Sequence, residues 1–172
     1  MQKEEERLIM SNHVSGKIML QGKKEDLLKV FGTFIRTMDA GTKELSEAFT
    51  FEETETEITI RTPENAVVLV DDNFWGIRIS ELALKKVEEV WTLTAGIMGK
   101  YNIDLLFFSD MAYDFNLKGT AYAADPMMDW KSEIAMENKE VKKYGRITLS
   151  TGEYDNYLEH EVNPESEKET VQ

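Results

Sequence analysis

The chain has 172 residues, no cysteine, two histidines and a net charge of −13, and 41% of its residues are hydrophobic. This length is typical of a single domain that buries roughly 70% of the surface of its unfolded chain, so the fold needs neither a disulfide nor a metal. The charge disfavours nucleic-acid binding, because Lys and Arg supply most of the affinity for phosphates. No apolar run reaches the roughly 18 residues of a membrane span, and the N-terminus lacks a signal-peptide pattern, so we expect a cytoplasmic protein.

The first half of the chain predicts one strand, one helix and three further strands. Residues 14–21 form the first strand, and 24–38 form a helix because apolar residues recur there at intervals of three and four. The alternating stretch 48–62 predicts half-buried strands, with a bulge or a turn near Glu52 and Glu53. A short apolar strand follows at 66–70.

The second half predicts a longer helix and several strands. A helix is expected over 80–101, with Ser80 as its N-cap. The run Leu-Leu-Phe-Phe at 105–108 predicts a buried strand, and 114–124 a second strand. Two weaker strand candidates, 130–136 and 146–150, are expected to pair around Asn138 and Lys139.

This order of elements predicts an α+β fold. Strand, helix, strand, strand, helix, strand is the split βαβ arrangement of a ferredoxin-like βαββαβ core, with two helices on an antiparallel sheet, here extended by C-terminal strands. Residues 1–150 are predicted to form this single domain. Residues 151–172 are predicted to form an acidic, flexible tail. The spacing of Tyr154, Tyr157, Leu158 and Val162 predicts a short helix in it that docks on the domain or on a partner.

The acidic residues are concentrated in two segments. Residues 43–57 carry a net charge of −5 and residues 151–172 a net charge of −6. Such surfaces attract a basic protein partner, although acidity also serves solubility alone. The interaction residues predicted in the first segment are Glu52, Glu53, Glu55 and Glu57.

Catalytic and metal chemistry have few candidates in this sequence. His13 and His160 lie far apart with no cysteine between them, so a zinc site lacks its ligands, and no phosphate loop or dinucleotide motif is present. We therefore expect no cofactor, no metal and no catalytic residues. Turn carboxylates that share a cation are the alternative to solvated turn acids, and the residues concerned are Asp71, Asp72, Asp110 and Asp114.

Trp75 and Arg78 are the remaining candidates for an interface. Both residue types anchor protein interfaces when they are exposed. If Trp75 is buried, it is an ordinary core residue.

Two segments carry a resemblance to a known family. The stretch Asp72-Asn73-Phe74-Trp75-Gly76-Ile77-Arg78, and the stretch from Thr94-Ala95 through Lys100–Phe107 to Asp114–Gly119, resemble the YubB-type ferredoxin-like domain of plasmid and phage proteins. The resemblance implies a ferredoxin-like core and an origin on a mobile genetic element, and it brings no catalytic residues.

Three hypotheses about function follow. The first is a non-enzymatic interaction module of a phage or plasmid, which inhibits a basic nucleic-acid-binding host protein by presenting carboxylates in place of phosphates. The alternative is an enzyme that binds a small ligand or a divalent metal through the turn carboxylates. The third is a self-associating module that forms a homodimer.

Overall fold

A computed structural model gives the fold, and the structure describes residues 13–39, 41–42, 44–46, 49–62, 66–69, 77–100 and 103–160. The strands are β1 (His13–Gly22), β2 (Ile35–Met38), β3 (Leu45–Ser46), β4 (Thr50–Glu53), β5 (Glu57–Arg61), β6 (Ala66–Leu69), β7 (Ile77–Val87), β8 (Val90–Lys100), β9 (Lys118–Asp125), β10 (Trp130–Glu137), β11 (Glu140–Thr148) and β12 (Tyr154–Asn156). The helices are α2 (Lys24–Leu28), α3 (Val30–Thr33), α4 (Leu106–Asp114) and α5 (Tyr157–His160), and Pro126–Met128 form a 3-10 turn.

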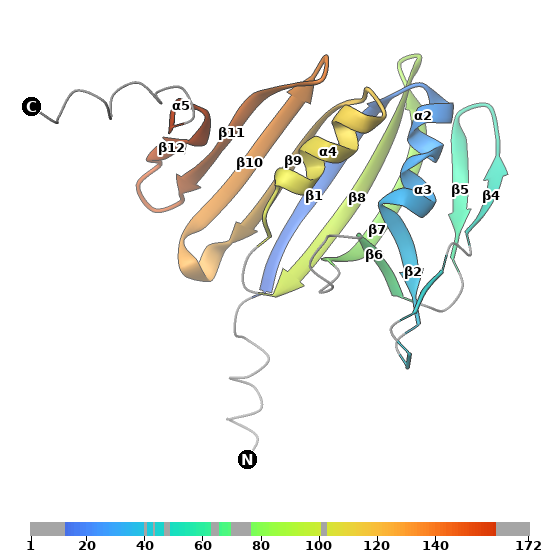
Figure 1. Cartoon of the computed structure of the whole chain (residues 1–172), viewed down its shortest axis with the longest axis horizontal. Coiled ribbons are helices and arrows are strands. Elements are labelled where there is room, and N and C mark those ends of the chain that lie inside the picture. The colour runs from blue at the N-terminus through green and yellow to red at the C-terminus, as the bar shows by residue number, and fades with distance from the viewer. Residues whose placement is uncertain are drawn as a thin grey trace, which may run out of the picture.

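All of these strands belong to one twelve-stranded sheet with antiparallel pairing (Figure 1). Its main order is β12-β11-β10-β9-β1-β8-β7-β6-β2-β3. The sheet forks at β7, because the first residues of β7 pair with β6 and its later residues pair with β5, which carries β4 beyond it. The N-terminal strand β1 therefore lies in the middle, between β8 and β9.

Helices α2, α3 and α4 lie over the same face of the sheet, and this face holds the core (Figure 1). Residues of β1, β8 and β9 alternate between buried and more exposed positions, as expected for strands with one packed face. Phe108 and Met111 of α4 are fully or nearly fully buried against this face. Gly119 makes room for the helix, since a Cβ at this position would lie 2.9 Å from Cζ of Phe108.

The predicted ferredoxin-like α+β fold is wrong. The structure is a twelve-stranded antiparallel sheet with short helices, and it lacks the two long covering helices of the prediction among its described residues. The main cause is the segment 80–101, which forms most of β7 and β8 instead of a helix. A two-residue turn at Glu88 and Glu89 joins these strands, with Val87 opposite Val90.

Two further elements differ from the sequence prediction. The helix predicted over 24–38 is reduced to the short pieces α2 and α3, because Phe31 and Gly32 have non-helical backbone angles and Ile35–Met38 pairs with β6 as strand β2. The predicted strand 105–108 is instead the start of α4. An apolar run of four residues fits a buried helix as well as a buried strand, and here its apolar spacing continues to Met111 and Ala112.

Other predictions are confirmed. The first strand is β1. The candidate 130–136 is β10, and it pairs around Asn138 and Lys139, which both have positive φ, with β11; the candidate 146–150 overlaps only the end of β11, which already begins at Glu140. Asn favours this conformation, so the turn signal in the sequence was physically sound.

Candidate functional site

The four glutamates singled out in the sequence lie on the hairpin of β4 and β5. Glu52 and Glu53 belong to β4, Glu55 lies in the turn and Glu57 begins β5, and all four are exposed. Among the described strands, the hairpin joins the rest of the sheet through the pairing of Glu57 and Ile58 with β7. The hairpin lies at one end of the molecule (Figure 1).

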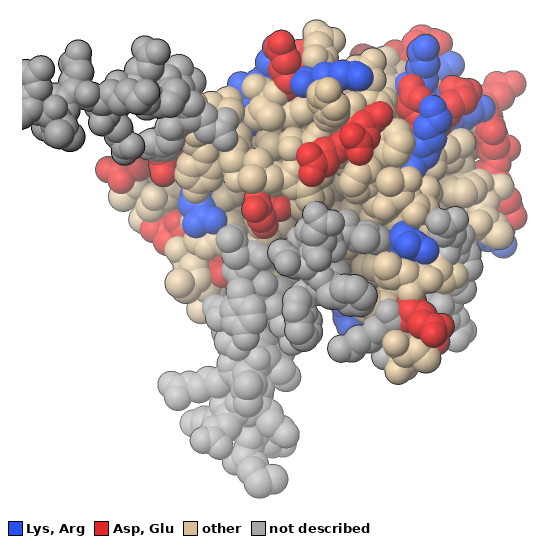
Figure 2. Space-filling view, viewed as in Figure 1, with Lys and Arg blue, Asp and Glu red and all other residues tan. Residues whose placement is uncertain are grey.

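Three of these carboxylates are paired with basic side chains. The nitrogen-to-oxygen distances are 2.9 Å for Arg61 and Glu52, 2.5 Å for Lys24 and Glu53, and 3.7 Å for Lys85 and Glu57. The hydrogen bond to Glu53 is also the largest cause of the raised pKa of Lys24. Figure 2 shows acidic and basic side chains interleaved at this end of the molecule. The hairpin thus presents alternating charge, which a row of phosphates does not.

A second acidic surface lies on α4, and we call it the α4 outer face. It consists of Leu106, Asp110, Tyr113 and Asp114, whose spacing places them on the solvent side of the helix. Asp110 and Asp114 were predicted to flank a turn between strands, and this prediction is wrong because both belong to the helix. Figure 2 shows a group of acidic side chains at the position that α4 occupies in Figure 1.

The carboxylates of the α4 outer face form no ion pair with the described residues. Among the described residues, neither Asp110 nor Asp114 forms an ion pair or a hydrogen bond through its side chain. Two large hydrophobic side chains accompany them, since Leu106 is 45% exposed and Tyr113 is 53% exposed. Lys139, from the turn between β10 and β11, lies 5.1 Å from the ring centroid of Tyr113. The surface therefore combines free negative charge with apolar area.

The other predicted interaction residues do not join either acidic surface. Arg78 is exposed on β7, beside Met98 on the face opposite the helices, and Trp75 lies outside the described residues. Tyr154 is on β12 and Tyr157 on α5, so both belong to the segment that was predicted as a tail. These two elements lie at the end of the sheet opposite β4 and β5 (Figure 1). The predicted residues thus form separate surfaces.

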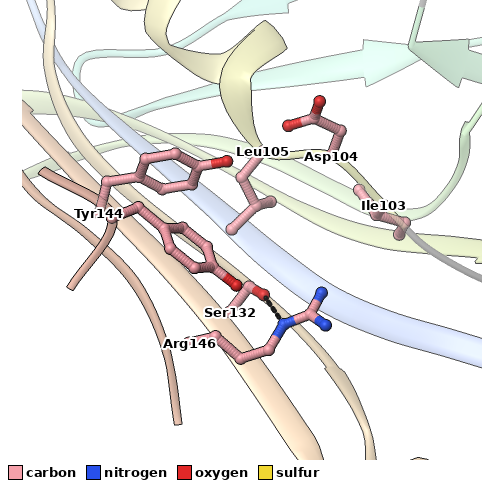
Figure 3. Close-up of a pocket in the computed structure, with 7 residues that line it drawn as sticks. Ile103, Asp104, Leu105, Ser132, Tyr144 and Arg146 are labelled. Atoms are coloured by element: carbon pink, nitrogen blue, oxygen red, sulfur yellow. Dashed lines mark hydrogen bonds between the residues drawn. The ribbon is translucent and has the colours of Figure 1, made fainter. Parts of the chain in front are cut away.

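A cavity of about 200 Å³ lies beside α5, and no sequence signal had pointed to it. Ile103, Asp104 and Leu105 line it from the segment that leads into α4, and Tyr157 lines it from α5. The remaining wall comes from Ser132 of β10 and from Tyr144 and Arg146 of β11 (Figure 3). Four segments that are distant in the sequence or separated by turns therefore meet at one small hollow.

One hydrogen bond and one ring contact orient the Arg146 side chain at this cavity. Nε of Arg146 donates to Oγ of Ser132 at 3.0 Å, and the guanidinium carbon lies 4.2 Å from the ring centroid of Trp130. Burial is the largest cause of the raised pKa of Tyr144, and the Asp104 carboxylate raises it further. The phenol is therefore a neutral hydrogen-bond donor at neutral pH.

The described part of the chain shows no metal centre. No group of three or more His, Cys, Asp or Glu side chains that could hold an ion is found among the described residues. The predicted cation candidates Asp71 and Asp72 lie outside those residues. In the same part of the chain, no helix is both long and apolar enough to cross a membrane.

Comparison of the chain with protein-family models, curated proteins and solved structures gives no match. The resemblance to the YubB-type domain therefore stays a prediction. The ferredoxin-like core that it implied is not the fold of this chain.

Proposed function

We propose that the protein is a non-enzymatic interaction module that binds a protein partner with a basic surface. The observation that supports this proposal is the α4 outer face, where Asp110 and Asp114 are exposed without ion-pair partners among the described residues. An excess of thirteen negative charges over the whole chain adds a long-range attraction for such a partner.

The exposed hydrophobic side chains give this surface a short-range component. Leu106 and Tyr113 border the two carboxylates, and burying an aromatic ring at an interface contributes more than a charge pair at its rim. A basic partner that also covers these two side chains would gain both contributions. The α4 outer face therefore suits a protein partner better than a small cation.

The finer form of the proposal concerns the identity of the partner. A basic nucleic-acid-binding protein of a host, inhibited by a protein of a phage or plasmid, fits the sign of the charge. The ion pairs of Glu52, Glu53 and Glu57 argue against the β4–β5 hairpin as the phosphate-like element of such an inhibitor. In this form of the proposal, the α4 outer face contacts the basic partner in place of the β4–β5 hairpin.

The test is partner capture followed by quantitative binding with matched variants. The full chain is used as bait in a bacterial lysate. The purified partner is then titrated against the wild type and two double variants at several salt concentrations. We expect the double variant Asp110→Asn/Asp114→Asn to bind about tenfold more weakly and with a smaller salt dependence. The matched control Glu52→Gln/Glu57→Gln removes two carboxylates that already have partners and should bind almost like the wild type. Equal affinity of the α4 variant and the wild type contradicts the proposed surface.

Self-association is a second candidate, favoured by the face of the sheet that carries no helix in Figure 1. Met98 is 43% exposed and Tyr122 is 40% exposed on this face. A homodimer through it predicts a twofold mass in analytical ultracentrifugation that the variant Met98→Lys/Tyr122→Lys reduces to the monomer. A monomeric wild type at all concentrations rules this candidate out.

A further inference from the structure

The face of the sheet that carries no helix has a charge opposite to that of the whole chain. Its side chains alternate along each strand with the buried residues of the core, and they come mainly from β1 and from β7 to β11. Basic side chains outnumber acidic ones at these positions, with Lys17, Arg78, Lys85, Lys118, Lys131 and Lys143 against Glu81, Glu133 and Glu137. Such a face favours a negatively charged partner surface.

Three of these basic side chains already have acidic partners, and three do not. The ion pairs, with nitrogen-to-oxygen distances of 3.7, 3.1 and 2.8 Å, are those of Lys85 with Glu57, Lys118 with Glu137 and Lys143 with Glu133. Within the described part of the chain, Lys17, Arg78 and Lys131 form no ion pair, and neither does Glu81. The unpaired charge of the face is therefore positive.

The unpaired cations surround two exposed hydrophobic side chains. In the register of the sheet, Arg78 lies opposite Met98 and Lys17 lies opposite Tyr122. Nζ of Lys131 lies 4.8 Å from the ring centroid of Tyr122. Met98 is 43% exposed and Tyr122 is 40% exposed. We call these five residues the cationic sheet face.

The α4 outer face has the complementary composition. It carries two unpaired carboxylates one helical turn apart, with about 6 Å between their Cβ atoms, and two exposed hydrophobic side chains. On the cationic sheet face, Lys17 and Lys131 belong to the strands on either side of β9, so about 10 Å separates these strands. Long lysine side chains can close this difference, and the sulfur of Met98 suits contact with an aromatic ring such as that of Tyr113.

We propose that the cationic sheet face binds the α4 outer face of a second copy of this chain. This inference rests on the role proposed above for the α4 outer face and names one partner for it. Two copies that met through their cationic sheet faces would place cations against cations, whereas the contact between the two unlike surfaces pairs opposite charges.

The positions of the two surfaces decide the form of the assembly. Helix α4 lies over the face of the sheet that holds the core (Figure 1), and the cationic sheet face lies on the opposite side. Each copy can therefore bind one neighbour on each side, and the association continues past the dimer. Because α4 has nine residues and is about 14 Å long, each contact is small and the association is weak.

The experiment measures the mass of the full chain by analytical ultracentrifugation from about 10 μM to about 1 mM protein. The salt concentration is about 0.15 M, at which charges more than about 8 Å apart are largely screened and the net charge of −13 on each copy opposes association less. We expect the average mass to rise with concentration and to pass twice the mass of the monomer.

Charge-reversal variants locate both surfaces. Asp110→Lys/Asp114→Lys and Lys17→Glu/Lys131→Glu each place like charges at the contact, so each should weaken self-association by about tenfold or more. A chain with all four substitutions has opposite charges at the contact again and keeps the net charge of −13, so it should associate like the wild type. If Lys131→Glu does not fold, Arg78→Glu replaces it, with circular dichroism as the check.

A matched control separates the contact from net charge. Glu52→Lys/Glu57→Lys changes the net charge by the same amount as the reversal on α4, but on the β4–β5 hairpin, and it should associate like the wild type. The inference is overturned if the wild type stays monomeric, if its mass stops at the dimer, or if the chain with all four substitutions associates as weakly as the two double variants.

The same variants distinguish this inference from the proposed function. A wild type that stays monomeric, while a lysate partner still requires Asp110 and Asp114, overturns self-association alone and leaves the proposed function standing. If neither self-association nor partner binding depends on these two carboxylates, both are overturned.

Discussion

The turn between β7 and β8 offers the sharpest test of the fold, because the sequence favours a helix through the same residues. Glu88 has φ of 48° and Glu89 has φ of 70°, a conformation that costs side chains with a Cβ roughly 1–2 kcal/mol per residue. Two-residue turns with positive φ at both positions prefer Asn followed by Gly. We therefore consider the double variant Glu88→Asn/Glu89→Gly.

The variant should be more stable than the wild type. Removing the backbone strain at the two positions stabilises the fold by about 2 kcal/mol. The greater freedom of Gly in the unfolded chain reduces this gain by about 0.4–1 kcal/mol. The ion pair of Glu89 with Lys86, at 3.1 Å, is lost, but the Glu89 side chain is 90% exposed and the loss is small. A net gain of about 1 kcal/mol raises the Tm by about 2–4 °C in a chain of this size.

A helix through residues 80–101 would give the opposite sign. Asn and Gly inside a helix together cost about 1.5 kcal/mol. Thermal and urea unfolding, followed by circular dichroism, measure the difference. The control Glu88→Gln/Glu89→Gln removes the same two charges and keeps both side chains. If the Asn-Gly variant melts below both the control and the wild type, the hairpin is not the structure of this segment.

Three further predictions concern packing and pH. Phe108→Ala empties a fully buried site between α4 and the sheet and should lower the free energy of unfolding by about 3–5 kcal/mol in urea titrations; a loss below 1 kcal/mol contradicts that packing. Gly119→Ala places a Cβ 2.5 Å from the carbonyl oxygen of Met19 and 2.9 Å from Phe108, so it should destabilise by about 1–3 kcal/mol, whereas Gly152→Ala meets no atom within 4 Å but is strained by its φ of +73°. The raised pKa of Tyr144 contributes stability that is present below the ordinary pKa of 10.0 and is lost as the pH rises through the raised value. Tyr144→Phe should therefore lose less stability than the wild type between pH 9 and 11 in urea titrations, and an identical loss in both proteins would show that this phenol is not the titrating group.

The hairpin of β7 and β8 shows why a strong sequence pattern led to the wrong element. Leu82 and Leu84, and then Leu93, Ala95 and Ile97, alternate with a period of two, so the strand signal was present. This strand signal was missed because the turn sequence Glu88-Glu89 has no preference for positive φ and so does not indicate a hairpin. In the hairpin of β10 and β11, Asn138 supplied that preference, and the pairing around it was predicted, although only the end of β11 was recognised as a strand.

Helix α4 shows the reverse error. The four apolar residues at 105–108 cannot distinguish a strand from a helix by themselves. The buried set Leu105, Phe108, Met111 and Ala112 has helical spacing, but Asp110 and Asp114 read more simply as turn residues. Length and context decide such cases, and the context here is the neighbouring sheet.

The candidate sites depend on contacts between residues that are far apart in the chain, and the amino-acid composition does not indicate such contacts. The exposure of the hairpin glutamates followed from their local pattern, whereas their partners Lys24 and Lys85 come from distant parts of the chain. The cavity needed Asp104, Ser132 and Arg146 to meet, and the antiparallel register of β10 and β11 brings the last two together. No spacing along the sequence encodes that meeting.

The central position of β1 has a consequence for how the chain folds. Among the described strands β1 precedes all others in the chain, yet both of its neighbours come from residues 90–125, so neither edge can be paired until β8 has been made. Pairings of such long sequence separation close slowly, because the entropy of a large loop is lost before the contacts form. Until then, β9 to β12 can assemble as consecutive hairpins while β1 stays open on both sides. We therefore expect the insertion of β1 to be a late step of folding, which joins the two parts of the sheet into one.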